Sequence, residues 1–281
     1  MEAQTATPQT ECECGVHPSV FYLLATLLLT SCSTAMLCAA IMTEHWEHVV
    51  WDHAALAALA NASNTALQWL LDEKVAKIED TSNRKGGGTF LVPMNGGIWT
   101  MCVSLDEEEV SILSRAGFPS QPVCTNYLAN SDDEEPRADW QHRMQNLSIS
   151  CALVCLIVLG SAALVGAFGI CKHQISAVLI TGVMYLLAGL FAMFTLMIIH
   201  FKRVQRVSLR GSAHADGSAD GVAGGGGARA AAGPLLAARD FSTAWSLDLG
   251  WAGVALATTT SLLWILLSKI MRYNPISTML L

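Results

Sequence analysis

The chain has 281 residues, of which 52% are hydrophobic and only 14% are charged. An ordinary soluble domain has about 25% charged residues, so this composition predicts membrane-spanning segments. The net charge is −7, and residues 43–146 alone carry 16 acidic and 7 basic side chains, a balance of −9. This acidity argues against a basic surface for nucleic acid, and no nucleic-acid partner is expected.

Four apolar runs are long enough to cross a bilayer, which takes about 20 residues. They lie at 20–42, 147–170, 175–199 and 245–268. The only charged residue within them is Asp248, near the start of the last run. Ionisable groups inside a span usually mark ion paths, proton relays or gating charges. Their scarcity argues against a pump, a proton-coupled transporter or a voltage sensor, and predicts a multi-pass protein whose first partner is the lipid bilayer.

The orientation of the spans receives conflicting signals. No Lys or Arg precedes the first run, which favours a retained signal anchor over a cleaved signal peptide. The link between the third and fourth runs is the most basic one, and the positive-inside rule would place it in the cytoplasm. The sequon Asn61-Ala62-Ser63 and the cysteines of the first loop instead favour an extracellular first loop, because glycans and disulfides form in the secretory lumen.

We favour a plasma-membrane protein with its first loop outside and both termini inside. The cytoplasmic segments are then 1–19, 171–174 and 269–281, and the extracellular loops are 43–146 and 200–244. Residues 211–233 of the second loop are rich in Gly, Ala, Ser and Asp, which predicts disorder.

Several elements are expected within the two loops. Valine and tryptophan predict a strand over 44–53, and alanine and leucine at helical intervals predict a helix or helical pair over 54–80. Strands are expected at 89–93 and 98–105, around a turn at Asn95-Gly96-Gly97. The acidic runs 106–109 and 132–135 are interpreted as solvated loops. A further strand is expected at 204–209 or at 240–246.

Two possible sites in the first loop involve cysteine or histidine. Cys102 follows the turn at strand spacing, and it is either a free thiol or half of a disulfide with Cys124, the next cysteine along the chain. His45, His48 and His53 stand close to Glu47, but they form no known metal-binding pattern and have no second ligand cluster downstream. We expect no metal site.

The series Trp46, Gly97-Ile98-Trp99, Cys102 and Cys124, with Gly250-Trp251 in the last run, resembles the claudin, PMP22 and calcium-channel γ-subunit superfamily. The resemblance implies a left-handed four-helix bundle capped by a small extracellular antiparallel sheet. It also implies a Cys102–Cys124 disulfide that staples the sheet. We expect Trp46 and Trp99 to pack the sheet against the bilayer surface, and Trp46 and Trp51 would also suit a small extracellular core. In claudins the first tryptophan stands close to the second and the cysteines are nearer together. Here 52 residues separate the tryptophans and 21 separate the cysteines.

These departures favour an accessory subunit of a channel or receptor, and the alternative is a cell-junction or adhesion component of the claudin type. No nucleophile motif, paired carboxylate in an apolar setting or cofactor fingerprint occurs, so neither an enzyme nor a cofactor is expected. Possible modifications are a glycan on Asn61 and palmitoylation of Cys12, Cys14 and Cys171. The end Met279-Leu280-Leu281 fits a PDZ scaffold.

Overall fold

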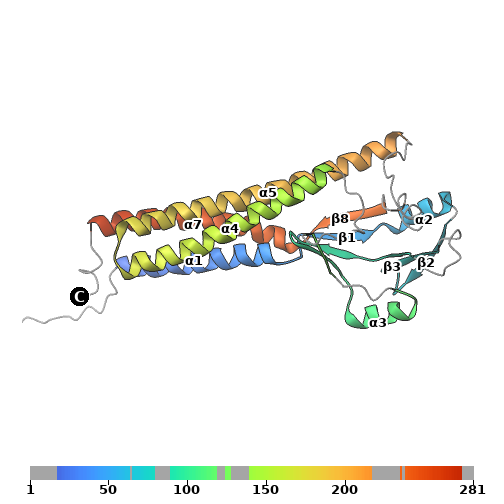
Figure 1. Cartoon of the computed structure of the whole chain (residues 1–281), viewed down its shortest axis with the longest axis horizontal. Coiled ribbons are helices and arrows are strands. Elements are labelled where there is room, and N and C mark those ends of the chain that lie inside the picture. Colours follow the sequence, from blue (N-terminus) through green and yellow to red (C-terminus); the bar gives the residue numbers. More distant parts are fainter. Residues whose placement is uncertain are drawn as a thin grey trace, which may run out of the picture.

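The computed structural model describes residues 18–63, 65–79, 89–118, 124–127, 139–216, 235 and 238–273. Four long helices form one end of the molecule, and two small antiparallel sheets with two short helices form the other (Figure 1). The protein is therefore mainly helical with a small antiparallel sheet region, as the composition and the loop patterns predicted.

The long helices are α1 (Pro18–Met42), α4 (Asp139–Cys171), α5 (Ile175–Asp216) and α7 (Trp245–Tyr273). All four are long and apolar enough to cross a membrane, which confirms the prediction of four spans. Two of them run beyond the predicted limits. The helix α4 begins before residue 147, and α5 continues through residues 200–216, which were expected to belong to a loop.

The helices pack in the order α1–α7–α5–α4. Small residues let their backbones approach closely. A Cβ on Gly166 of α4 would lie 3.0 Å from Thr181 of α5, and a Cβ on Gly182 would lie 3.1 Å from the carbonyl oxygen of Ser261. Hydroxyl and indole groups add bonds between helices, for example from Trp264 Nε1 to Thr30 Oγ1 at 2.9 Å. Close contact through small and weakly polar residues is typical of membrane helices.

The larger sheet has five strands in the order β7-β6-β5-β1-β8. Every neighbouring pair is antiparallel, with Glu47 of β1 opposite Gly96 of β5 and Cys102 of β6 opposite Cys124 of β7. The strands are β1 (Glu47–Trp51), β5 (Met94–Gly96), β6 (Thr100–Val103), β7 (Cys124–Asn126) and β8 (Arg239–Thr243). The predicted strand within 44–53 is confirmed. Of the two later candidates, 240–246 overlaps β8, whereas 204–209 lies inside α5.

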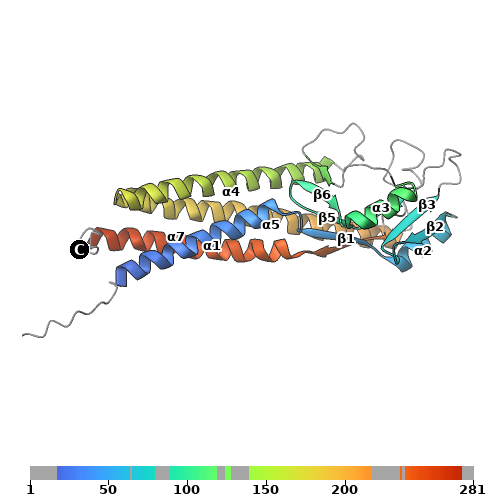
Figure 2. The same ribbon diagram turned by 90° about the horizontal axis from the view of Figure 1, so that it is seen from below.

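The first loop also carries a second folded unit, which we call the distal module. It consists of α2 (His53–Ala62), β2 (Ala66–Leu70), β3 (Val75–Glu79), β4 (Thr89–Leu91) and α3 (Glu107–Arg115). Its three strands form a separate antiparallel sheet in the order β2-β3-β4. Figures 1 and 2 place this module at the end of the molecule farthest from the start of α1.

The helix expected over 54–80 is correct only for α2, and β2 and β3 replace the rest. The connecting turn places Leu71, Asp72 and Glu73 at φ values of 53°, 50° and 67°. Left-handed backbone is unfavourable for such residues, and glycine or asparagine normally signals it. The hairpin is nevertheless favoured because both strands place side chains in a core. Val75, Ala76 and Ile78 are at most 2% exposed.

The acidic run at 106–109 is not a loop either, because it begins α3. Three glutamates occupy the first helical turn, where the helix dipole favours negative charge. The backbone N–H of Asp106 donates to Glu109 Oε2 at 3.1 Å, which satisfies a group at the start of the helix. Leu113 is 1% exposed and joins a small core with Val75 and Val92. The run at 132–135 lies outside the described residues.

Candidate functional site at the joint between sheet and helices

The C-terminal end of α1 meets the five-stranded sheet, and the motif tryptophans are bonded to it. The last four carbonyls of a helix have no partner within the helix. Trp46 Nε1 donates to the carbonyl of Ala40 at 2.7 Å, and Trp99 Nε1 donates to the carbonyl of Ile41 at 2.8 Å. The N–H of Thr43 donates to the carbonyl of Ala39 at 3.1 Å. The two indoles therefore satisfy the helix end and fix the sheet on it.

Trp46 is 3% exposed and belongs to the core shared by the four long helices. Its ring lies above Gly250 of α7, where an added Cβ would be 3.7 Å from Trp46 Cη2 and 3.0 Å from Leu196 Cδ2. The expectation that this tryptophan packs against the bilayer surface is wrong, because protein surrounds the ring. Trp251, the second residue of the Gly-Trp pair, is 41% exposed.

The turn between β5 and β6 consists of Gly97, Ile98 and Trp99, so Asn95 and Gly96 belong to a strand and not to the turn. The N–H of Gly97 donates to the carbonyl of Thr100 at 2.8 Å and closes the turn. A Cβ on Gly97 would lie 2.9 Å from the Cα of Glu44. Real Cβ atoms do not approach backbone this closely, and glycine is required because of the neighbouring chain.

Ile98 connects the turn to α4 and α5 (residues 139–171 and 175–216). Its side chain is 1% exposed in the bundle core, and its carbonyl accepts a hydrogen bond from Gln145 Nε2 at 2.7 Å. Gln145 Oε1 in turn accepts from Lys202 Nζ at 2.7 Å. Sequence reasoning missed Gln145 and Lys202, because both stood next to predicted spans without a motif of their own. The available signal was that both are polar residues close to an apolar run, where each helix leaves the span.

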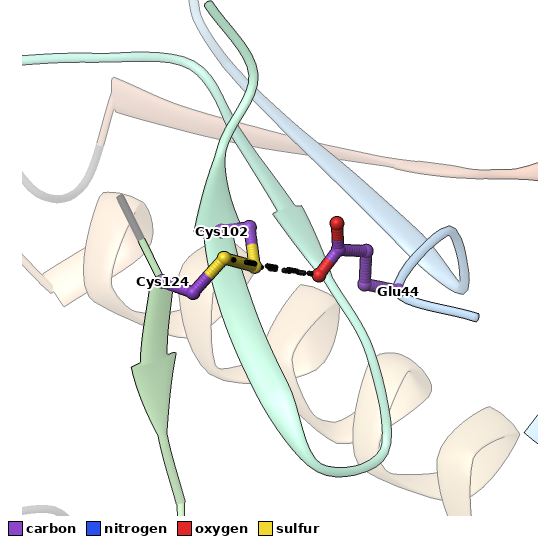
Figure 3. A group of neighbouring side chains, drawn as sticks. All are labelled: Glu44, Cys102 and Cys124. Atoms are coloured by element: carbon purple, nitrogen blue, oxygen red, sulfur yellow. Dashed lines mark hydrogen bonds between the residues drawn. A yellow bond between two sulfur atoms is a disulfide. The ribbon is translucent and has the colours of Figure 1, made fainter. Parts of the chain in front are cut away.

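Cys102 and Cys124 form a disulfide that joins β6 to the edge strand β7 (Figure 3). Of the two interpretations that the sequence allowed, the structure contains the bonded one. Cys102 is 4% exposed, and Cys124 is exposed. The bridge fastens β7, a three-residue strand whose only partner in the described part of the chain is β6.

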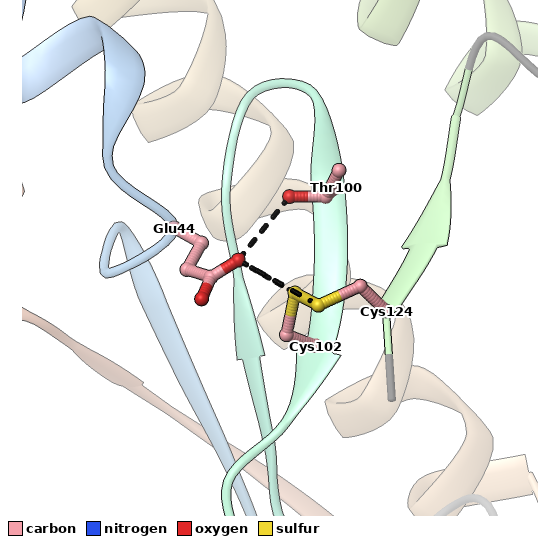
Figure 4. Close-up of a disulfide and its surroundings, with 4 residues drawn as sticks. All are labelled: Glu44, Thr100, Cys102 and Cys124. Carbon is pink, nitrogen blue, oxygen red and sulfur yellow. Dashed lines mark hydrogen bonds between the residues drawn. A yellow bond between two sulfur atoms is a disulfide. The ribbon is translucent and has the colours of Figure 1, made fainter. Parts of the chain in front are cut away.

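The carboxylate of Glu44 lies against this disulfide (Figures 3 and 4). Its Oε2 is 2.5 Å from Cys102 Sγ and 3.9 Å from Cys124 Sγ, and Thr100 Oγ1 lies 3.4 Å away. A disulfide sulfur carries no proton, so the threonine hydroxyl is the only one of these groups that can donate to the carboxylate. Glu44 therefore contacts both the turn and the disulfide, two residues after the end of α1.

Glu44, Cys102 and Cys124 are also the one trio of possible metal-ligating side chains found in the described part of the chain. Metal binding by cysteine requires the thiolate, and both sulfurs here are bonded to each other. The trio is therefore not a metal site in this state.

The histidines of the first loop do not gather around Glu47. His48 Nδ1 lies 2.7 Å from Asn95 Oδ1, His53 stacks on Trp69 at 4.3 Å between ring centroids, and His45 lies 5.6 Å from the ring of Trp245. Each ring therefore has a packing or hydrogen-bonding role of its own in the sheet region.

The other predicted sites lie at a distance from the joint. Asn61 is exposed near the end of α2, and Cys171 is exposed at the end of α4. Cys12, Cys14 and the end Met279-Leu280-Leu281 lie outside the described residues.

The joint attaches the sheet to the long helices. The hydrogen bonds from the Trp46 and Trp99 indoles and from Gln145 connect the sheet or its turn to long helices, and the disulfide fastens the edge of the same sheet. A comparison with models of known protein families and a comparison with curated proteins both find no match to this chain.

Proposed function

We propose that this protein is a claudin-like accessory subunit of a channel or receptor, with its sheets outside the cell and its four long helices in the plasma membrane. In this proposal the helices lie beside the partner in the same membrane, and the distal module contacts the partner's outer surface. The resemblance in the motif residues and the departures in their spacing both support this assignment.

The observation that carries the proposal is the distal module itself. The residues that lengthen the first loop form a sheet and two helices with their own buried side chains, including Leu56, Val75 and Leu113, which are at most 1% exposed. A folded unit keeps a defined surface for a partner, which a disordered insertion would not. The joint described above fixes the underlying sheet on the helices and so determines how far from the membrane the module is held.

The module has features that suit a protein contact. Ile112 of α3 is 53% exposed, and the neighbouring Glu107 and Glu108 are exposed and acidic. Among the described strands β2 is an edge of its sheet and pairs only with β3, so its outer backbone groups can add a strand from a partner. An apolar residue beside carboxylates favours a partner surface with basic residues around an apolar contact.

Site-specific crosslinking tests this proposal. A photo-crosslinking amino acid at Ile112 is expected to capture a channel or receptor subunit from the same membrane. Ile157, which is 67% exposed on α4, provides a control position on a helix, because crosslinks from it should reach lipid or the partner's spans. Crosslinks from Ile112 only to copies of this chain on a neighbouring cell would replace the accessory role with the junction role.

A further inference from the structure

A small cavity lies where the turn Gly97–Trp99 meets α4 and α5. Its volume is about 20 Å³. Residues from five parts of the chain line it, including Trp46, Glu47, Gly96, Gln145, Ser148 and Lys202. It therefore lies beside the hydrogen bonds from Gln145 to Ile98 and from Lys202 to Gln145.

Ser148 is the unusual member of this lining. It is 2% exposed, and its Oγ makes no hydrogen bond to any described residue. A serine inside a helix commonly bonds to the carbonyl four residues earlier. Ser150 in the same helix does this, with its Oγ donating to the carbonyl of Asn146 at 2.8 Å. A buried hydroxyl without a partner is costly, so the Ser148 hydroxyl needs an acceptor or donor that the described residues do not supply.

The size and chemistry of the cavity select its ligand. One water molecule needs about 10–15 Å³ of such space and two to four polar partners. The cavity is large enough for one water, and serine, glutamine and lysine groups contribute to its lining.

We propose that the cavity is a binding site for a single buried water that hydrogen-bonds to Ser148 Oγ and bridges α4 to the motif turn. The sheet is then attached to the helices in two ways. On the α1 side the indoles of Trp46 and Trp99 make direct hydrogen bonds, and on the α4 and α5 side a water completes the contact. The water in this site therefore helps to attach the sheet to α4 and α5.

The substitution Ser148→Ala separates a wet site from a dry one by the sign of its effect. If water bonds to the hydroxyl, its removal leaves the water with one partner fewer, and we expect the unfolding temperature in detergent to fall by about 2–4 °C. If the site is dry, the same change removes an unpaired buried hydroxyl, and the temperature should stay the same or rise. Ser150→Ala is the matched control, because that exposed hydroxyl bonds only within its own helix.

A density map that resolves ordered waters gives the second measurement. We expect a peak within hydrogen-bonding distance of Ser148 Oγ in the unaltered protein, and a weaker or absent peak in Ser148→Ala. The absence of that peak in the unaltered protein overturns the proposal, and so does an unchanged or raised unfolding temperature in the variant. If the variant cannot be purified, the map of the unaltered protein decides by itself.

Discussion

The indole N–H of Trp99 donates a hydrogen bond to the carbonyl of Ile41, 58 residues earlier in the chain and in the last turn of α1. This bond gives a physical reason for a tryptophan in the turn of a β-hairpin, because a helix end leaves carbonyls unpaired. Trp46 does the same for Ala40. The two residues couple the sheet to the first long helix, and the predictions below begin with that coupling.

The substitution Trp99→Phe keeps an aromatic ring but removes the donor. The carbonyl of Ile41 then loses its partner, and we expect a loss of about 1–3 kcal/mol in the free energy of unfolding. Thermal unfolding of the purified protein in detergent measures this. Trp251→Phe is the control, since that ring is 41% exposed, and an equal loss in the two variants would contradict a specific role for the Trp99 bond.

The substitution Gly97→Ala places a Cβ 2.9 Å from the Cα of Glu44. The turn must shift away from Glu44, and we expect a cost of about 1–3 kcal/mol, as for overpacked sites. Gly160 offers a matched control, because a Cβ there meets nothing within 4 Å. Gly160→Ala should be neutral or stabilise the helix by about 0.5–1 kcal/mol. An unfolding temperature of Gly97→Ala that equals or exceeds that of Gly160→Ala would refute the steric explanation.

Cys102→Ser removes the disulfide that closes a sequence separation of 22 residues. In the chain-entropy model a loop of this size contributes about 3 kcal/mol. We expect the variant to be retained inside the cell, whereas Cys171→Ser, at an exposed free cysteine, should reach the surface normally. Surface biotinylation measures delivery. Normal surface delivery of Cys102→Ser, together with unchanged mobility on a non-reducing gel, would contradict a disulfide that the fold requires.

The proposed orientation predicts a glycan on Asn61, which is exposed near the end of α2. Asn61→Gln and Ser63→Ala should abolish the mobility shift caused by an N-glycosidase, and Ser63→Thr should preserve it because the sequon remains. The other sequon, Asn146-Leu147-Ser148, lies within α4, and Ser148 is buried. The absence of an N-glycosidase mobility shift in the unaltered protein and in Ser63→Thr would contradict an extracellular first loop.

An ion pair between Lys74 and Glu109 connects the β2–β3 turn to α3, with Lys74 Nζ 2.6 Å from Glu109 Oε1. The hydrogen bond from Lys74, followed by that from the Asp106 backbone, lowers the pKa of the Glu109 carboxyl. Because this pKa is lower in the folded state, the ion pair stabilises the fold fully above the ordinary carboxyl pKa of about 4.3. That stabilisation is lost as the pH falls through the lowered pKa of the folded protein. Hydrogen exchange in the first turn of α3 should therefore quicken in acid.

The Lys74 pKa is raised by the same hydrogen bond, so its contribution is lost only as the pH rises through that raised value. Glu109→Gln should remove the acid-dependent loss of protection in α3, and Glu108→Gln, at an exposed position in the same turn, should leave it in place. The Lys74 side chain is 57% exposed, so added salt should weaken the effect. If hydrogen exchange in α3 depends on pH in Glu109→Gln as it does in the unaltered protein, another group controls the loss of protection in acid.

Sequence reasoning found the elements whose signal is local. Long apolar runs gave the four spans, and β-branched and aromatic residues gave the strand at β1. The pairing of Cys102 with Cys124 and the importance of Trp46 and Trp99 came from the resemblance and not from periodicity. What the two tryptophans bond to was hidden, because it depends on carbonyls that lie 6 and 58 residues away.

The errors have physical causes that can be named. The β2–β3 hairpin was hidden because Leu71, Asp72 and Glu73 adopt left-handed backbone without a glycine. Its clue was the sequence Ala76-Lys77-Ile78-Glu79, in which apolar and polar residues alternate with a period of two. The helix α3 had a clue in Asp106 and Glu109, the spacing of a capping box. Gln145 and Ser148 could not be assigned, since only the folded turn brings the Ile98 carbonyl to the first of them.

The most direct test of the accessory role is imaging of the tagged protein in polarised epithelial cells, with crosslinking and mass spectrometry on the same sample. Mixing cells that carry two different tags distinguishes contacts within one membrane from contacts between neighbours. The account predicts a diffuse surface label and a channel or receptor as the main crosslinked partner. Concentration of the label at cell contacts, with crosslinks between the two tags, would contradict it and establish a junction protein instead.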